Sequence, residues 1–287
     1  MSRAGIAILA SRVRLEEKRI FQALERRTVR YERVDARALW GQATGPAPWP
    51  VVLNREIGHA RAINAARLLE ATGALVVNSA SAAEVCGDKW RTSVALAQAG
   101  VATPRTAIAL TPRAALDALD GIGYPAVIKP LVGSWGRLVT PVPDPATAAA
   151  VLEYVAAQPS PQSRVVYVQE LVDQPAGDLR VIVIGGEAIG AVRRVGRGWH
   201  ANVSRGAATE YLPQGPELAK VAVAAAGATN ADIAGVDVIE DRDGRLMVIE
   251  VNHGVEFAGF QAAHGDRVDV ADRIVEHLLT RAGQWCE

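Results

Sequence analysis

The chain has 287 residues, of which 49% are hydrophobic and 22% are charged. This composition is typical of a soluble globular protein, and it excludes a disordered chain or a small disulfide scaffold. Thirty-one basic residues balance thirty-one acidic ones, so net charge gives no argument for binding to nucleic acid or to a membrane. Only four of the basic residues are lysines, namely Lys18, Lys89, Lys129 and Lys220.

The two cysteines, Cys86 and Cys286, lie far apart and outside any metal-binding spacing. We therefore expect a reducing, cytoplasmic setting. The apolar run at residues 5–10 is followed at once by charges and by no cleavage site, which argues against a signal peptide. No apolar stretch approaches the roughly 20 residues that cross a bilayer, so we expect no membrane association.

The first part of the chain alternates short apolar runs with helical patterns. Such alternation indicates a parallel α/β domain, which we place at residues 1–87. The predicted elements are a strand at 5–10, a helix marked by Leu15, Ile20, Phe21 and Leu24, a strand at 51–53, a helix at 60–71 and a strand at 74–78.

The remainder of the chain mixes strands and helices without strict alternation, which indicates an α+β section. The fold class predicted for the whole chain is therefore α/β and α+β. The predicted elements are helices at 88–99, 145–157 and about 216–228, strands at 126–129, 165–169 and 179–184, a strand pair at about 234–252, and a closing helix through Val270, Ile274, Leu278 and Leu279.

The strand pair near the C-terminus carries polar residues within apolar runs. An Asp/Gly-rich turn joins the two strands and predicts an antiparallel hairpin. If residues 241–244 form the whole turn, Asp237 pairs with Val248. Alternation of side chains then places Asp237, Glu250 and Asn252 on one face. Two carboxylates and an amide oxygen suit Mg²⁺, and an edge strand with polar residues in solvent is the alternative.

A glycine-rich segment follows the strand that ends in Lys129. Its glycines let backbone N–H groups approach phosphate oxygens, and its arginine adds charge. An ordinary turn is the alternative, because the spacing matches neither a P-loop nor a Rossmann motif. A lysine at the end of an apolar strand beside this segment favours anion binding over snorkelling to solvent. The segment consists of Gly133, Ser134, Trp135, Gly136 and Arg137.

Two further groups of residues give weaker indications. The end of a strand can offer backbone groups to an adenine edge and a carboxylate to a ribose, and Gln169, Glu170, Leu171, Val172, Asp178 and Arg180 lie in such a segment. A later basic and polar series could hold carboxylate or oxyanion charge, with a solvated surface as the alternative. It consists of Arg193, Arg194, Arg197, Asn202 and Arg205.

In their order and spacing, these segments resemble the ATP-grasp superfamily of carboxylate–amine ligases. The closer resemblance is to the RimK-like LysX/ArgX family, and it spans nearly the whole chain. It implies an ATP-grasp fold after a preATP-grasp domain, with a lid domain at 88–172 and a C-terminal magnesium-binding domain at 173–287. The motifs that carry it are Cys86–Trp90, Ile128–Pro130, Gly133–Leu138, Gln169–Val172, Asp178–Arg180, Glu250–His253 and Glu256–Phe257.

The resemblance also implies roles for individual residues. Lys89 and Lys129 would contact ATP phosphates, with residues 133–137 as a loop over them. Residues 169–172 would form the adenine hinge, with Asp178 and Arg180 as nearby nucleotide contacts. The magnesium ligands would be Asp237, Glu250 and Asn252. The catalytic arginines would be Arg193 and Arg205, and the amino-acid substrate would contact Arg193, Asn202, Ser204, Arg205, Glu256, Gly259 and Phe260.

Members of this family attach an amino acid to the C-terminal glutamate of a small acidic amino-group carrier protein. The carrier carboxylate attacks the γ-phosphate to give an acyl phosphate, which the substrate amine then displaces. Such catalysis consists mainly of positioning and charge neutralisation. The resemblance thus implies ATP and Mg²⁺ as cofactors, the carrier and an amino acid as partners, and a homo-oligomer, either dimer or tetramer.

The choice of amino acid depends on the segment around Phe260. Glutamate-specific members of the family carry Gly-Phe here, and α-aminoadipate-specific members carry Asn and a small residue. Gly259 and Phe260 therefore favour glutamate, although one methylene is worth only about 1–3 kcal/mol. The alternatives are α-aminoadipate, a carrier pathway of secondary metabolism, a RimK-like ligase for another protein or small molecule, and an ATP-binding regulatory module without turnover.

Overall fold

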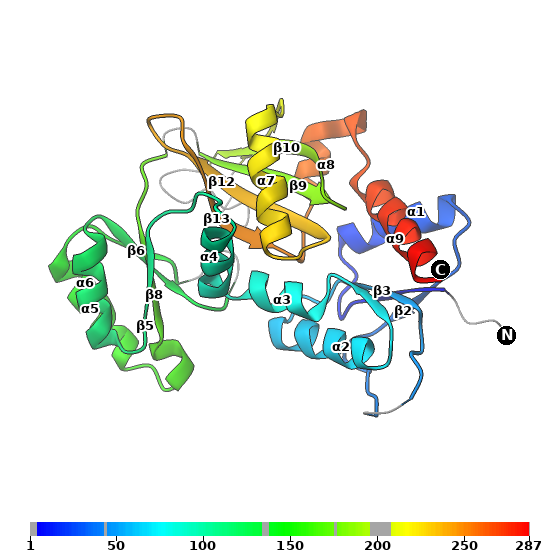
Figure 1. Cartoon of the computed structure of the whole chain (residues 1–287), viewed down its shortest axis with the longest axis horizontal. Helices are drawn as coiled ribbons and strands as arrows, with labels where there is room; N and C mark the ends of the chain where they lie inside the picture. The colour runs from blue at the N-terminus through cyan, green and yellow to red at the C-terminus, as the bar shows by residue number, and fades with distance from the viewer. Residues whose placement is uncertain (1–4, 43–44, 134–137, 175–176, 196–207, 287) are drawn as a thin grey trace.

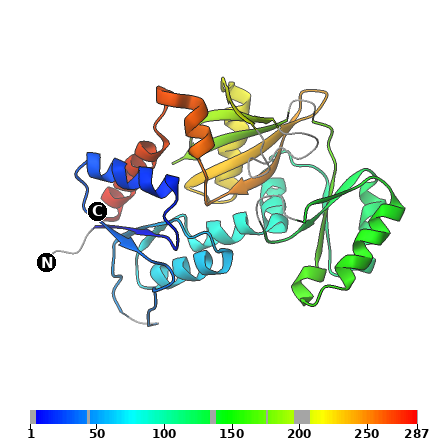
Figure 2. The same cartoon turned by 180° about the vertical axis from the view of Figure 1, so that it is seen from behind.

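A computed structural model of the chain describes residues 5–42, 45–133, 138–174, 177–195 and 208–286. These residues form three β-sheets with flanking helices, and the lobe built on α5 and α6 lies at one end of the molecule (Figures 1 and 2). In these ranges, no helix has both the length and the apolar character needed to cross a membrane.

The N-terminal sheet is parallel throughout, with strand order β2-β1-β3-β4, which confirms the predicted parallel α/β region. β1 and β3 are buried at every position, as expected for parallel strands that are covered on both faces. Helix α1 buries Ile20, Phe21 and Leu24, whereas Leu15 is exposed. The elements are β1 (Ile6–Leu9), α1 (Leu15–Arg26), β2 (Tyr31–Val34), β3 (Val51–Asn54), α2 (His59–Ala71), β4 (Leu75–Val77) and α3 (Ala80–Gly87).

The central sheet is antiparallel, with strand order β5-β8-β6-β7. Helices α5 and α6 begin with prolines, and the side chains of Thr111 and Asp144 cap them. These two helices cover the sheet and give it a hydrophobic core of its own. The elements are α4 (Lys89–Gln98), β5 (Thr106–Ala109), α5 (Pro112–Ile122), β6 (Ala126–Pro130), β7 (Thr140–Val142), α6 (Pro145–Ala156), a 3₁₀ turn (Pro161–Arg164) and β8 (Val166–Glu170).

The C-terminal sheet is antiparallel, with strand order β11-β10-β9-β12-β13. On β9, Leu179 and Val181 belong to a core with α7, while the alternating residues Asp178 and Arg180 line a cavity on the other face. The elements are β9 (Asp178–Ile184), β10 (Glu187–Val195), β11 (Ala208–Leu212), α7 (Pro216–Ala228), β12 (Ile233–Glu240), β13 (Leu246–Asn252), α8 (Ala258–His264), a 3₁₀ turn (Gly265–Arg267) and α9 (Val270–Cys286).

The N-terminal and C-terminal sheets share one hydrophobic core. Ile8 of β1 and Leu278 of α9 belong to the same buried cluster as Ile182 of β9. Helices α1 and α9 lie side by side in both views, and Arg27, directly after α1, donates to Asp272 of α9 at 2.6 and 2.7 Å. This shared core places the first turn of α1 beside the segment that follows β13.

Candidate nucleotide and metal site

A cavity of ≈ 580 Å³ lies where the three sheets meet. Its walls include Arg14 before α1, Lys129 of β6 and Asp237 of β12, so each sheet region contributes charged side chains. Small-molecule sites usually have volumes of about 300–1,000 Å³ and a few converging polar groups. The size and lining of this cavity fit a nucleotide-sized ligand.

Lys129 is half-buried in the wall of this cavity at the end of β6. Its Nζ donates a 2.6 Å hydrogen bond to Oε1 of Gln169 on the neighbouring strand β8. Burial lowers the pKa of Lys129 to about 8, although the carboxylate of Glu250 acts in the opposite direction. A partly desolvated ammonium with a neutral partner is well suited to bind an anion.

Lys89 is fixed at the first position of α4. The carboxylate of Asp88 caps this helix, and the Lys89 N–H donates to Leu131 O at 3.0 Å. The ammonium donates to Gly133 O at 2.8 Å and lies 3.9 Å from Glu250 Oε1. The sequence motif around residue 89 therefore positions a second lysine in the same cavity as the first.

The hairpin of β12 and β13 brings together the three predicted metal ligands, but its predicted register is wrong. Asp237 lies opposite Glu250, not Val248. The loop spans residues 241–245, one more than expected, and a β-bulge directly after Asp237 shifts the register once more. A total shift of two residues keeps the side chains on the same face. Asn252 therefore still lies beside Asp237, and its Nδ2 is 3.4 Å from Asp237 Oδ2.

Asp237 is buried and held by two arginines. Arg180 makes a bidentate contact with it at 2.7 Å for each pair of atoms, and Arg194 lies 3.0 Å from its Oδ1. Arg194 also contacts Asp178 at 3.1 Å. Burial tends to raise the pKa of Asp237, but the two guanidinium groups outweigh it and the pKa is lowered. The carboxylate is therefore ionised at neutral pH.

The chemistry of this set fits Mg²⁺ better than a metal that needs a complete protein cage. In the described ranges, no group of three or more His, Cys, Asp or Glu side chains is placed to hold a metal ion. Asp237 and Glu250 provide two carboxylates, and Asn252 provides an amide oxygen. Mg²⁺ typically takes one or two protein carboxylates and completes its shell with phosphate oxygens and water.

The predicted adenine hinge lines the cavity from Gln169 to Val172. The backbone N–H groups of Glu170 and Leu171 donate to Arg105 O and Pro125 O, at 2.9 and 3.1 Å. The carboxylate of Glu170 accepts a hydrogen bond from Arg105 at 2.6 Å. The backbone N–H groups of Glu170 and Leu171 are therefore engaged within the protein.

The structure does not bring Arg193 into the cavity. On β10, Arg194 lies opposite Asp178 and lines the cavity, and Arg193 lies opposite Leu179 of the α7-facing core. Strand alternation therefore gives the position in the cavity wall to Arg194, and the catalytic and substrate-binding role of Arg193 stays a prediction. The sequence pattern included Arg194 in the basic series but could not separate it from Arg193, because no strand was predicted at β10 and so neither side chain could be assigned to a face.

Several predicted site residues lie outside the described ranges. They are Ser134, Trp135, Gly136 and Arg137 of the glycine-rich segment, and Asn202, Ser204 and Arg205 of the predicted substrate contacts.

The predicted substrate residues after β13 line the same cavity as the two lysines, although they lie far from them in the sequence. They are Glu256, Gly259 and Phe260. Phe260 is 3% exposed and stacks on His264, with ring centroids 4.2 Å apart. Gly259 packs closely on Thr209, since a Cβ there would lie 3.3 Å from the threonine Oγ1. Glu256 is exposed and contacts Arg14, which also lines the cavity.

Comparison with known proteins identifies two family regions in the chain. A model of the LysX preATP-grasp domain matches residues 6–85, and a model of the RimK-like ATP-grasp domain matches residues 86–278. The boundary between the two matches falls near the end of α3.

Curated relatives and a solved structure match most of the chain. It is 30% identical over 282 residues to the glutamate–LysW ligase ArgX of Sulfurisphaera tokodaii, covering 95% of this chain and 97% of that protein. It is 33% identical to the α-aminoadipate–LysW ligase LysX of Sulfolobus acidocaldarius, covering 82% and 83%. The crystal structure of a RimK domain ATP-grasp protein from Sphaerobacter thermophilus superposes with a TM-score of 0.79 at 27% identity, covering 96% and 100%. The chain therefore belongs to the RimK-like ATP-grasp ligases of the LysX/ArgX family.

Proposed function

We propose that this protein is an ATP-dependent ligase that joins the α-amino group of glutamate to a small acidic amino-group carrier protein. The bond would form with the side-chain carboxylate of the carrier's C-terminal glutamate. The observation that carries the proposal is the convergence of Lys89, Lys129, Asp237 and Glu250 on one cavity, in a chain similar over 95% of its length to a glutamate–LysW ligase.

The two lysines would bind the phosphates of ATP. Lys129 is positioned by Gln169, whose amide Nε2 in turn donates to Tyr167 at 2.9 Å and to Thr106 at 3.0 Å. This network fixes the amide oxygen toward the ammonium without adding a negative charge. The full charge of Lys129 is then available to an incoming phosphate, which is the kind of preorganised electrostatic stabilisation that accelerates phosphoryl transfer.

Asp237, Glu250 and Asn252 would hold Mg²⁺, which when bound neutralises charge on the phosphates. Arg180 and Arg194 hold Asp237 in place from the sheet side. They also keep it ionised, since they lower its pKa against the effect of burial. The protein thus positions and ionises one metal-binding carboxylate, that of Asp237, before ATP or Mg²⁺ binds.

The reaction would take place in two steps between ATP and the two acyl partners. A carboxylate oxygen of the carrier attacks the γ-phosphorus, and the bond to the departing ADP breaks. The glutamate nitrogen, after losing a proton, then attacks the acyl carbon, and phosphate leaves with the electron pair of the C–O bond. No protein nucleophile is needed, so the chain contributes positioning and charge.

Gly259 and Phe260 support glutamate over α-aminoadipate as the amino acid. The ring of Phe260 fills space at the cavity wall, and its stacking on His264 limits how far it can move. α-Aminoadipate is the second candidate because the chain is also 33% identical to a ligase named for that substrate. One methylene gives a preference of about 1–3 kcal/mol, so the longer substrate would react more slowly and still react.

The proposal is tested by ADP release from purified enzyme, ATP and Mg²⁺. The assay combines the carrier with glutamate, with α-aminoadipate or with no amino acid, and also includes glutamate without the carrier. The proposal expects the highest rate with carrier and glutamate together. Equal turnover of free glutamate without the carrier would refute it.

A further inference from the structure

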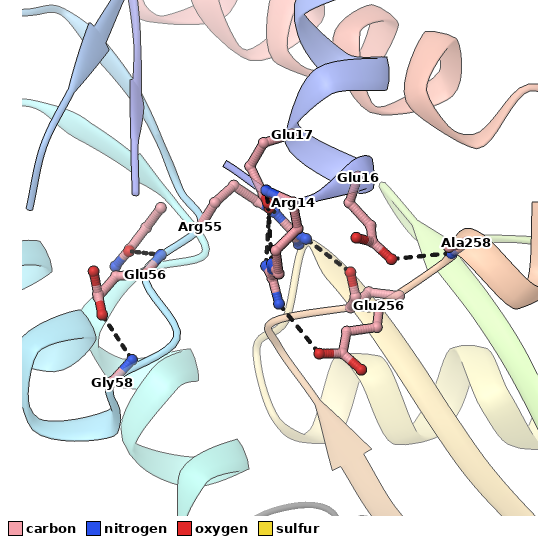
Figure 3. A network of polar contacts seen from close by, with 10 residues as sticks. Arg14, Glu16, Glu17, Arg55, Glu56, Gly58, Glu256 and Ala258 are labelled. Atoms are coloured by element: carbon pink, nitrogen blue, oxygen red, sulfur yellow. Dashed lines mark hydrogen bonds and ion pairs between the residues drawn. The ribbon is translucent and has the colours of Figure 1, made fainter. Parts of the chain in front are cut away.

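Arg14 brings a guanidinium group from the N-terminal region to the substrate end of the cavity. It directly precedes α1, and its side chain points toward the segment after β13 (Figure 3). Its Nε and Nη2 donate to the two oxygens of Glu17 at 3.0 and 2.9 Å. Its third nitrogen, Nη1, faces Glu256 at 3.2 Å. Two nitrogens of Arg14 therefore fix the group, and the third is directed at the cavity.

The support behind Arg14 is buried and rigid. Glu17 is fully buried and also accepts a 2.9 Å hydrogen bond from Nε of Arg55, which is itself 3% exposed. Arg55 in turn donates to Val255 O at 2.9 Å, which attaches this cluster to the backbone beside Glu256. Glu17 can balance only one of the two arginines. The remaining positive charge is presented through Arg14, the arginine of this pair that is only partly buried.

The partner of Arg14 on the cavity side differs from Glu17 in its environment. The side chain of Glu256 is 45% exposed, and it belongs to the short segment between β13 and α8. The nearby carboxylate of Glu16 is buried and accepts the Ala258 N–H at 3.1 Å, so it is committed to the backbone. An exposed ion pair such as Arg14–Glu256 contributes only about 0–1 kcal/mol, so a ligand carboxylate can replace it at little cost.

Burial tends to lower the pKa of Arg180, but nearby carboxylates, Asp237 first and then Glu250 and Glu256, outweigh it and the pKa is raised. Arg14 contacts the exposed carboxylate of Glu256 directly, and Arg180 of β9 contributes a second guanidinium group to the wall of the cavity. All three residues line the same cavity. A bound acidic amino acid would need such a cationic site for its side-chain carboxylate. In this structure the carboxylate of Glu256 occupies that position.

We propose that Arg14 is the receptor for the side-chain carboxylate of the acidic amino-acid substrate, and that Glu256 is its replaceable stand-in. This inference rests on the proposed function for the identity of the amino acid. The substrate amine would then point toward the phosphate end, where Lys89 and Lys129 lie. Arg14 would thereby require an acidic side chain on the substrate. Together with Phe260 in the cavity wall, it would also limit the length of that side chain.

The experiment compares the wild type with Arg14→Gln, Arg14→Lys, Glu256→Gln and the matched control Arg12→Gln, whose exposed side chain lies two residues away. Binding of glutamate and of its neutral isostere glutamine is measured by titration calorimetry with a non-hydrolysable ATP analogue present. Steady-state KM values for glutamate, ATP and carrier are measured in parallel. Melting temperatures show whether each variant remains folded.

Arg14→Gln is expected to raise the Kd and KM for glutamate about 10- to 100-fold, because it removes a charge-assisted hydrogen bond. It should leave the KM for ATP within about twofold and reduce the preference for glutamate over glutamine by a similar factor. Arg14→Lys should recover part of the loss, because it keeps the charge without the fork geometry. Glu256→Gln should bind glutamate at least as tightly as the wild type, and Arg12→Gln should behave as the wild type.

An unchanged preference for glutamate over glutamine in folded Arg14→Gln would overturn the inference. So would a loss of glutamate affinity in Glu256→Gln as large as that in Arg14→Gln, since Glu256 would then be a direct ligand. The binding measurement separates this inference from the proposed function. Arg14-dependent glutamate binding without transfer to the carrier would refute the function alone, and transfer with normal KM in Arg14→Gln would refute the inference alone.

Discussion

Lys129 and Gln169, on the neighbouring strands β6 and β8, are joined by a 2.6 Å hydrogen bond between the ammonium and the amide oxygen. The pair occupies the wall of the cavity in which Lys89 and Glu250 also lie. A neutral acceptor positions the ammonium and leaves its charge for a ligand. This arrangement determines how ATP turnover and stability should respond to substitution of Lys129 and to pH.

Lys129→Ala is expected to lower kcat/KM for ATP by about 10²–10³-fold, because it removes a preorganised charge from the phosphates. Circular dichroism and melting temperature should be close to those of the wild type. Lys220→Ala is the matched control, because this exposed lysine lies on α7 away from the cavity lining. Equal ATP turnover in the two variants would contradict the phosphate role.

The pKa of Lys129, lowered by burial to about 8, predicts a pH dependence of ATP binding. Phosphate needs the protonated lysine, so the KM for ATP should rise as the pH increases beyond about 8. Gln169→Glu places a carboxylate beside the ammonium, favours its charged form and should move this rise to higher pH. The Tyr167 hydroxyl can donate to the new carboxylate, whereas the Thr106 hydroxyl already donates to Pro104 O at 2.8 Å. A pH profile of KM that is identical in both proteins would exclude Lys129 as the titrating group.

The same lysine makes stability depend on pH in a defined direction. Its folded pKa of about 8 lies below the ordinary value of 10.5, so the unfolded chain binds more protons between these pH values. This group therefore makes the free energy of unfolding increase as the pH rises through that window. Urea unfolding of the wild type and Lys129→Met at several pH values measures the contribution. The difference between the two proteins should shrink as the pH approaches 10.5.

Asp237 and Glu250 are expected to be equally necessary for Mg²⁺-dependent turnover but unequal in their effect on stability. Asp237→Ala leaves Arg180 and Arg194 without their shared buried carboxylate and should destabilise the fold by roughly 3–5 kcal/mol. Glu250 has a side chain that is 31% exposed, and Glu250→Ala should cost less than about 1 kcal/mol. Urea unfolding and Mg²⁺ titrations of both variants check this. Retained Mg²⁺-dependent turnover in Glu250→Ala would remove it from the ligand set.

Phe260→Leu should shift the amino-acid preference toward α-aminoadipate. The smaller side chain opens the cavity wall by about one methylene, so the ratio of kcat/KM for the two amino acids should change by about tenfold. The measurement is the ratio within each protein, which cancels general losses of activity. A ratio equal to that of the wild type would show that the length of the substrate is sensed elsewhere.

The sequence predicted those parts of the fold and site that depend on local pattern. Apolar periodicity located β1, α1 and the β12–β13 hairpin, and alternation placed Asp237, Glu250 and Asn252 on one face. It could not predict the bulge after Asp237, because a bulge depends on how two strands pair and not on either strand alone.

Other features depend on contacts between distant segments. Arg194 is buried because Asp178 and Asp237 meet it there, and neither partner lies near it in the sequence of β10. Arg14 lies 242 residues from Glu256 in the sequence, so their pairing follows from the packing of α1 beside the C-terminal segments. The short strands β2 and β5 carry too little pattern to be recognised outside the sheets that they complete.

Transfer of glutamate to the carrier is tested most directly by mass spectrometry of the carrier protein after incubation with enzyme, ATP, Mg²⁺ and glutamate. We predict a carrier heavier by one glutamyl residue, located at its C-terminal glutamate, and no modification when Lys129→Ala replaces the wild type. An unmodified carrier in the presence of active, ADP-releasing enzyme would contradict this prediction.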